Sequence, residues 1–283
     1  MEQKFAVIGY PLGHTMSPFI HRKLFAKKEI EASYTAKEIP PQALAKQRAE
    51  LAAMDGFNVT IPHKEAMIPL LDGLDDRAAL YGAVNTVRCR GGKMTGYNTD
   101  CAGFLRALSG GDISFGDRVA VLGAGGAARM MVFEAAVAKA AVTIAVRPSG
   151  LARAQAVKEE AERKLPGASV SLSTLSELSG AFSLLCNATP CGMFPRSQEC
   201  PIAPQVLDRV QAVFDAIYNP ARTVLLQEAE KRGIPAVGGM PMLVWQAAVA
   251  QELWFSVRFT EEEIAGVIAQ ADEELRRRSE QAE

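Results

Sequence analysis

A short glycine loop between two apolar strands constrains the fold more than any other feature of this sequence. The pattern runs through a buried strand, the loop, an apolar helix and a second strand: 118–122 (RVAVL), 123–126 (GAGG), 127–139 and 142–146 (VTIAV). Gly123, Gly125 and Ala128 fit G-x-G-x-x-G/A, whose small residues let a pyrophosphate approach the free N–H groups that open the helix. The context predicts a dinucleotide-binding βαβ unit, with a purely structural turn as the alternative.

The end of the second strand bears on which dinucleotide is bound. NAD sites usually place an Asp or Glu there, about 20 residues after the glycine loop, for the ribose 2′-hydroxyl. This chain has Arg147-Pro148-Ser149 and no acid. A guanidinium can pair with a 2′-phosphate, so Arg147 favours NADP over NAD. The alternative is that Arg147 is a solvated surface arginine.

Short strands also alternate with helices through the first hundred residues. We expect strands at 5–9, 32–38, 56–61, 83–87 and 93–97, and helices at 17–26 and 41–53. Ser17 as the cap and Pro18 in the first turn are signals for a helix start, and Gly91-Gly92 predicts a tight turn. The alternation predicts an α/β domain with a mainly parallel sheet.

A turn-rich stretch, 109–112, separates this region from the glycine loop, so we place a domain change between 103 and 116. Further strands are expected at 169–172, 183–187 and 213–216. The last forty residues predict two helices, the first over 242–258 and the second after a capping box formed by Thr260 and Glu263. Two consecutive helices do not continue a doubly wound sheet, and we expect them to pack back on the first domain.

Composition excludes several classes of protein. The 283 residues include 31 Lys plus Arg and 32 Asp plus Glu, for a net charge of −1, so no basic excess points to nucleic acid or acidic lipid. No apolar run approaches the ~18 residues of a membrane span, and the first residues do not have the pattern of a signal peptide. The five cysteines and three histidines lack metal-ligand spacings. We expect reduced thiols, a cytoplasmic location and no metal site.

The first domain carries four polar segments at predicted strand ends: 14–18 (HTMSP), 58–64 (NVTIPHK), 82–86 (GAVNT) and 96–100 (GYNTD). The carboxyl ends of strands in open α/β sheets face the ligand crevice. Amides, hydroxyls, one lysine and one aspartate in a single pocket suit a small polyhydroxylated acid.

These segments, in this order, resemble the shikimate dehydrogenase family, which includes the quinate/shikimate dehydrogenases. The similarity continues through 123–129 (GAGGAAR), 187–193 (NATPCGM), 215–220 (DAIYNP) and 238–246 (GGMPMLVWQ), and so covers nearly the whole chain. The resemblance implies a substrate-binding catalytic domain over 1–105 and 240–283, and a Rossmann NADP-binding domain over 106–239. The implied reaction is the reversible reduction of 3-dehydroshikimate to shikimate, in aromatic amino-acid biosynthesis.

The resemblance also implies residue roles. Lys64 and Asp100 match the family's catalytic pair, which suits a reaction that moves a hydroxyl proton as well as a hydride. The positions matching substrate contacts are Thr15, Ser17, Thr60, Asn85, Tyr218 and Gln246. The positions matching cofactor contacts are Gly123, Gly125, Gly126, Ala127, Arg147, Asn187, Thr189, Met193, Ala216 and Gly239.

The chain departs from the family pattern at a few positions. Thr15 stands where serine is usual, Val146-Arg147-Pro148 replaces asparagine-arginine-threonine, and Pro241 stands where glycine is common. These changes leave open a quinate/shikimate dehydrogenase that uses NAD or both cofactors. A non-catalytic metabolite-binding regulator is a third possibility, which the presence of both Lys64 and Asp100 disfavours. The chain is expected to act as a monomer or a homodimer on a small-molecule substrate.

Overall fold

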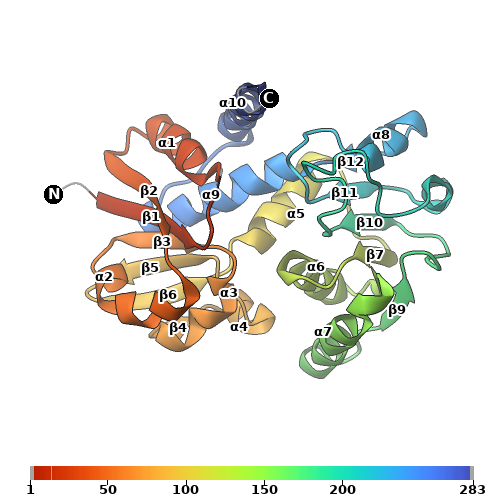
Figure 1. Ribbon diagram of the computed structural model, residues 1–283, viewed down its shortest axis with the longest axis horizontal. Coiled ribbons are helices and arrows are strands. Elements are labelled where there is room, and N and C mark those ends of the chain that lie inside the picture. Colours follow the sequence, from red (N-terminus) through yellow and green to blue (C-terminus); the bar gives the residue numbers. More distant parts are fainter. Residues whose placement is uncertain (1–2, 14, 281–283) are drawn as a thin grey trace. The chain divides into compact units, whose positions relative to one another are not determined.

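The computed structural model describes residues 3–13 and 15–280 of the chain. These fall into two compact units, each built on a six-stranded sheet (Figure 1). The first unit comprises Met1–Gly103 and Val244–Glu283, and the second comprises Phe104–Leu243. The chain therefore leaves the first unit and returns to it, and each passage lies inside a helix.

The sheet of the first unit has the strand order β2-β1-β3-β5-β6-β4, with β1 parallel to β2 and β3, and β5 antiparallel to both of its neighbours. Its strands are β1 (Gln3–Gly9), β2 (Ala32–Glu38), β3 (Gly56–Val59), β4 (Gly73–Leu74), β5 (Thr86–Arg90) and β6 (Lys93–Tyr97). Gly91 and Gly92, both at positive φ, make the tight turn between β5 and β6. Parallel pairing brings the carboxyl ends of β1, β2 and β3 to one edge, which is where the polar segments follow.

The helical segments of this unit are α1 (Ser17–Lys27), η1 (Pro41–Ala43), η2 (Ala45–Gln47), α2 (Arg48–Ala52), α3 (His63–Ala66), η3 (Ile68–Leu70), α4 (Asp76–Tyr81), the start of α5 (Asp100–Gly110), most of α9 (Gly239–Phe255), and α10 (Glu261–Glu280). Two expectations were wrong. The region 41–53 is two 3₁₀ turns and a five-residue helix. Ser17 is the first helical residue of α1 and does not cap it, because the cap position is Met16, which makes no side-chain bond.

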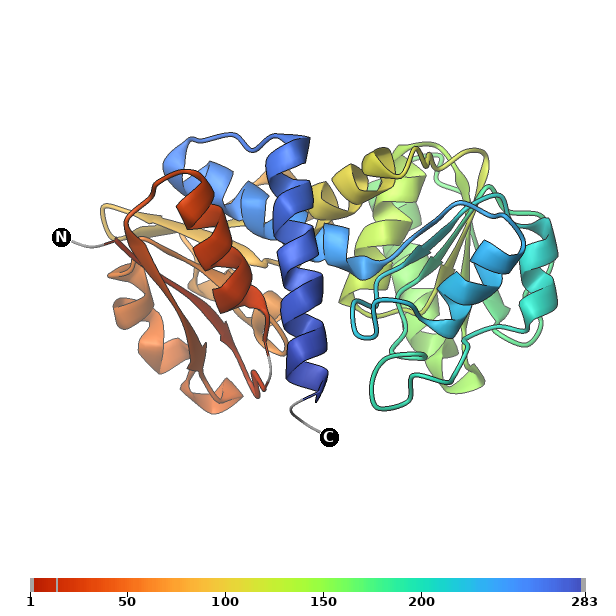
Figure 2. The same ribbon diagram turned by 90° about the horizontal axis from the view of Figure 1, so that it is seen from above.

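The C-terminal helices complete the first unit, as expected. Helix α10 lies alongside α1 (Figures 1 and 2), and an ion pair of 2.6 Å joins Lys28 to Glu263. The predicted capping box is present: the Thr260 N–H donates to Glu263 and the Glu263 N–H donates to the Thr260 hydroxyl. Trp254 of α9 packs on Phe5 of β1, so α9 covers a face of this sheet.

The second unit has the strand order β12-β11-β10-β7-β8-β9, and all five pairings are parallel. Followed from its other edge, this is the 3-2-1-4-5-6 order of a dinucleotide-binding sheet. Its strands are β7 (Arg118–Leu122), β8 (Ala141–Val146), β9 (Val170–Thr174), β10 (Leu184–Asn187), β11 (Val213–Asp215) and β12 (Ala236–Val237). Its further helical segments are α6 (Gly126–Val137), η4 (Pro148–Gly150), α7 (Leu151–Lys164), η5 (Pro204–Arg209) and α8 (Val224–Lys231).

The core strands of the second unit are continuous apolar runs, as expected where helices cover both faces of a parallel sheet. Val119, Leu122 and Ile144 are fully buried. Helices α6 and α7 pack on each other and on β7, β8 and β9, while α8 packs on β11 and β12 (Figure 1). The α/β architecture inferred from the sequence is confirmed in both units. Among the described residues, no helix is both long and apolar enough to cross a bilayer.

Candidate functional site

A lysine and an aspartate meet at the strand ends of the first unit. Lys64 lies on the short helix α3, after β3, and Asp100 is the first residue of α5, after β6. The Lys64 Nζ is 2.5 Å from the Asp100 Oδ2, and the two side chains are 28% and 19% exposed. The pair is thus partly shielded yet open to a ligand, which is the condition for proton exchange with a bound molecule.

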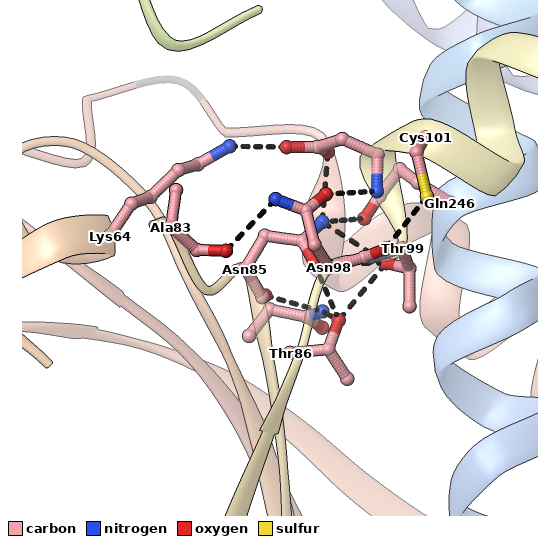
Figure 3. Close-up of polar contacts among 10 residues, drawn as sticks. Lys64, Ala83, Asn85, Thr86, Asn98, Thr99, Cys101 and Gln246 are labelled. Atoms are coloured by element: carbon pink, nitrogen blue, oxygen red, sulfur yellow. Dashed lines mark hydrogen bonds and ion pairs between the residues drawn. The ribbon is translucent and has the colours of Figure 1, made fainter. Parts of the chain in front are cut away.

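Asn85 fixes the other carboxylate oxygen. Its Nδ2 donates to the Asp100 Oδ1 at 2.8 Å, and its Oδ1 accepts from the Thr99 backbone N–H at 2.7 Å. Gln246, from α9, places its Oε1 3.5 Å from the same Nδ2. Figure 3 shows Lys64, Asn85, Thr99 and Gln246 converging on one region. Four of the predicted site residues are therefore brought together, from four separate segments of the chain.

The other predicted substrate positions are less tightly tied to this region. The Thr15 and Ser17 hydroxyls lie 3.3 Å apart at the start of α1, and the Thr15 carbonyl accepts from Arg278 of α10 at 3.3 Å. Thr60 directly follows β3, and its N–H donates to the Ile8 carbonyl. Tyr218 belongs to the second unit and is described there. His14, the first residue of one polar segment, lies outside the described residues.

The second unit carries a cavity of about 510 Å³ at the glycine loop. Gly123, Gly125, Arg147 and Thr189 of the predicted cofactor positions line it. Its other lining residues include Ser149, Arg153, Cys191, Arg196, Glu199 and Cys200, none of which the sequence analysis selected. Arg153 stands in the first turn of α7, the helix that follows Arg147. A second arginine so soon after the arginine that ends β8 is the sequence signal that could have identified it.

The glycine loop has the geometry that a phosphate cradle requires. Gly123 has φ +110°, and a Cβ added there would lie 3.1 Å from the Ala188 carbonyl oxygen. No side chain caps α6, whose cap residue is Gly125, so its first N–H groups are available to an anion. Gly126 and Ala127 are the first two residues of α6. The loop, the open helix end and two nearby arginines fit a dinucleotide with an additional phosphate.

The remaining cofactor positions, Asn187, Met193, Ala216 and Gly239, do not line the cavity. Asn187 is fully buried, and its Oδ1 accepts from the N–H and the hydroxyl of Thr189, which fixes the loop after β10. Met193 is 44% exposed. A Cβ added at Gly239 would lie 2.2 Å from the Ala216 carbonyl oxygen, so these two positions touch and only glycine fits at 239.

Two titrating groups of the second unit are shifted by burial. Burial raises the pKa of Asp215, at the end of β11, to about 6, although Thr223, Ile217 and Asn187 donate to its carboxylate. Burial also raises the pKa of the Tyr218 phenol, which therefore keeps its proton near pH 7. The Asp215 carboxylate is enclosed by its donors and the phenol is protonated, so neither group is an available base. The Lys64–Asp100 pair, by contrast, is partly exposed.

Known proteins are similar to this chain in sequence and in structure. Residues 7–87 match the model of the shikimate dehydrogenase substrate binding domain. The NADP(+) shikimate dehydrogenase of Shouchella clausii strain KSM-K16 is 40% identical over 259 residues, which is 90% of this chain and 93% of the relative.

Solved structures agree over nearly the full length. The shikimate 5-dehydrogenase of Thermus thermophilus, in complex with NADP(H) and shikimate, has a TM-score of 0.84 and 33% identity, covering 95% of this chain and 99% of that one. The shikimate 5-dehydrogenase of Listeria monocytogenes, in complex with shikimate and NAD, has a TM-score of 0.85 and 29% identity, covering 94% and 96%.

Proposed function

The chain belongs to the shikimate dehydrogenase family, and we propose that it catalyses the reversible, NADPH-dependent reduction of 3-dehydroshikimate to shikimate, in aromatic amino-acid biosynthesis. It is an oxidoreductase acting on a secondary alcohol. The observation that carries the proposal is the Lys64–Asp100 pair at 2.5 Å, held by Asn85 in a domain whose relatives are shikimate dehydrogenases.

The proton chemistry follows from the arrangement of this pair. Oxidation removes a hydride from C3 of the substrate and a proton from its hydroxyl, and reduction returns both. Lys64 and Asp100 share a hydrogen bond through Nζ and Oδ2, so one can pass to the other the proton taken from the substrate oxygen. The Asn85 amide occupies Oδ1, which keeps Oδ2 directed at Lys64. The hydroxyl and amide groups proposed to bind the substrate are those of Thr15, Ser17, Thr60, Tyr218 and Gln246.

The cofactor is proposed to occupy the cavity of the second unit. Gly123, Gly125 and the first N–H groups of α6 would hold the pyrophosphate, and Arg147, together with Arg153, would hold a 2′-phosphate. Bound NADP supplies the hydride acceptor, and NADPH the donor. Asn187 and Thr189 keep the loop after β10 in place beside the cavity. The five cysteines are free thiols, which fits the reducing cytoplasm as the proposed location.

Initial rates of the purified protein in a two-by-two grid test this function: shikimate or quinate, each with NADP or NAD. We expect dominant activity with shikimate and NADP. NAD is included because Val146-Arg147-Pro148 departs from the family's cofactor segment. Quinate is included because Thr15 replaces the usual serine. Dominant activity with quinate or NAD would replace the proposal with the broader quinate/shikimate dehydrogenase. Silence in all four combinations, from folded protein that binds NADP, would indicate a regulator.

Arg147 gives a sharper prediction about the cofactor. Arg147→Ala should raise the KM for NADP about tenfold and leave the KM for NAD within about twofold. The reason is that a charge-assisted hydrogen bond to a phosphate is worth roughly 1.5 kcal/mol at a partly exposed site. Arg163→Ala is the matched control, since Arg163 is an exposed arginine in the last turn of α7, away from the cavity. Equal losses for NADP and NAD would remove Arg147 from 2′-phosphate recognition.

A further inference from the structure

Tyr34 of β2 lies at the buried end of a hydrogen-bond chain that reaches Asp100. Its side chain is only 5% exposed and stacks on the His21 ring, with centroids 4.0 Å apart and planes 8° from parallel. The hydroxyl donates to the Asn58 Oδ1 at 2.6 Å. Burial also raises the pKa of Tyr34, so the phenol remains protonated and keeps its hydrogen as a donor.

The next bond fixes the direction of the chain. The Asn58 Nδ2 lies 3.2 Å from the Asn85 backbone carbonyl and 2.9 Å from the Thr86 hydroxyl. A carbonyl oxygen can only accept, so the Asn58 amide must present its NH₂ group to that side. Its Oδ1 is then left facing Tyr34, and only a donor satisfies it there. The Asn85 carbonyl therefore sets the orientation of the Asn58 amide, and the tyrosine hydroxyl supplies a donor to the oxygen that this orientation leaves buried.

The hydrogen-bond chain continues from Asn58 through the hydroxyls of Thr86 and Thr99. Because the Thr86 hydroxyl accepts from Asn58, its own hydrogen is free for the Thr99 hydroxyl at 3.0 Å or for the Asn85 Oδ1 at 3.2 Å. The Thr99 N–H also donates to that Oδ1. With its oxygen so engaged, the Asn85 amide directs its Nδ2 at the Asp100 Oδ1. Figure 3 shows Asn85 between Thr86 and Thr99 in this network.

All the intervening side chains are shielded from water. Thr86 is 0% exposed, Thr99 1%, Asn85 3% and Asn58 6%. Water cannot replace a missing donor at such positions, so removing one member leaves its partner unsatisfied or forces an amide to turn. The register of three neighbouring strands, β2, β1 and β3, brings Tyr34 to this place.

We propose that Tyr34 is a positioning residue: its hydroxyl, acting through Asn58, Thr86 and Asn85, holds the Asp100 carboxylate in the orientation that presents Oδ2 to Lys64. This inference rests on the proposed dehydrogenase function. It assigns a part in turnover to a buried tyrosine four hydrogen bonds from the carboxylate. A role confined to stability is the competing explanation.

The test is Tyr34→Phe, which keeps the ring on His21 and removes only the hydroxyl. With shikimate and NADP we expect kcat to fall about fivefold to twentyfold, while the KM for NADP stays within about twofold. Tyr81→Phe is the control, because Tyr81 is also buried in the same unit and Arg77 donates to its hydroxyl. A purely structural role would lower the melting temperature and leave kcat of the folded enzyme unchanged, which would overturn the proposal.

A double-mutant cycle with Thr86→Val supplies the second measurement. If both hydroxyls act through one chain, the double variant should lose little more kcat than the more impaired single variant, whereas independent effects multiply. Multiplicative losses would overturn the proposal. Thr86→Val alone carries the same kcat prediction should Tyr34→Phe fail to fold. An inactive wild type would overturn the proposed function and this inference with it, whereas an active wild type with an unaffected Tyr34→Phe variant overturns the inference alone.

Discussion

Lys64 owes its position to contacts of His63 and of its own backbone carbonyl more than to its helix, which is only four residues long. His63 is 1% exposed, and its Nε2 lies 2.6 Å from the Ile39 carbonyl, which requires a hydrogen on that nitrogen. The Lys64 carbonyl accepts from the Val84 N–H at 2.9 Å. The backbone is thus anchored at two points, and the flexible lysine side chain has Asp100 as its fixed partner.

Removing the Lys64 ammonium should therefore affect turnover and spare the cofactor site. We expect Lys64→Ala to lower kcat by about 10²–10⁴, the range for loss of general acid–base catalysis, with an unchanged dissociation constant for NADP. Steady-state rates and a fluorescence titration with NADPH measure the two quantities. Lys37→Ala is the control, because Lys37 also pairs with a carboxylate, Glu50, but on the surface. Wild-type turnover in the Lys64 variant would exclude Lys64 from the mechanism.

The sequence identified some of these residues and missed others for a physical reason. Lys64 and Asp100 stand in compact local motifs, and the carboxyl-end rule for parallel strands predicts that such motifs meet. Tyr34 has the pattern of an ordinary strand residue. Its contact with Asn58, 24 positions away, depends on the order of β2, β1 and β3, which no local pattern encodes. Arg153 was missed because its place beside the cavity depends on where α7 begins.

At the level of elements, a buried carboxylate ties together β10, β11 and the start of α8. Asp215 ends β11 and is 0% exposed. Its carboxylate accepts from Asn187 of β10 at 3.0 Å, from the Ile217 N–H at 3.1 Å and from the Thr223 hydroxyl at 2.7 Å. Thr223 in turn caps α8 by accepting from the Leu226 N–H. These bonds hold the ends of β10 and β11, and the loop after β10 lines the cavity at the glycine loop.

This carboxylate should make stability depend on pH in an uncommon direction. The pKa of Asp215 is about 6 in the folded protein against an ordinary 3.8, so between these values the folded state holds a proton that the unfolded state has lost. The contribution of Asp215 to the free energy of unfolding is therefore most favourable below about pH 4. It falls by up to about 3 kcal/mol as the pH rises through about 6.

Urea unfolding of the wild type and Asp215→Asn between about pH 4 and 7 measures this contribution. The stability of the wild type relative to the variant should fall across that range, because the amide does not titrate. Asp208→Asn is the control, since Asp208 is an exposed carboxylate of the same unit. A difference between wild type and Asp215→Asn that is constant with pH would contradict the raised pKa.

The accuracy of the expected elements varied with how local their signals are. The glycine loop, the Gly91-Gly92 turn and the Thr260 capping box each depend on a few neighbouring residues, and all three are present. The sequence pattern that favours a helix over 41–53 is the seven-residue spacing of Leu44 and Leu51, which places both leucines on one helix face. Leu44 and Leu51 are indeed buried, but the backbone reaches them through 3₁₀ turns, because packing against the sheet overrides a weak local preference.

At the level of the whole molecule, the two units are joined by continuous helices. The boundary between Gly103 and Phe104 falls inside α5, and the boundary between Leu243 and Val244 falls inside α9. In each of these helices, some intrahelical hydrogen bonds join a residue of one unit to a residue of the other. Unfolding either unit therefore breaks these bonds. Helix formation is cooperative, and a helix cut at one end frays into the rest. The two units should consequently unfold together.

The distribution of tryptophans makes this coupling measurable. The only two, Trp245 and Trp254, belong to the first unit, whereas the cofactor cavity lies in the second. NADP at about 100 times its dissociation constant adds about 2.7 kcal/mol to the stability of whatever unfolds with its site. We expect tryptophan emission and far-UV circular dichroism to report one urea transition, with one midpoint that NADP raises equally for both signals. Shikimate alone should raise the same midpoint. A tryptophan transition unmoved by saturating NADP would show that the units unfold independently, despite the helices they share.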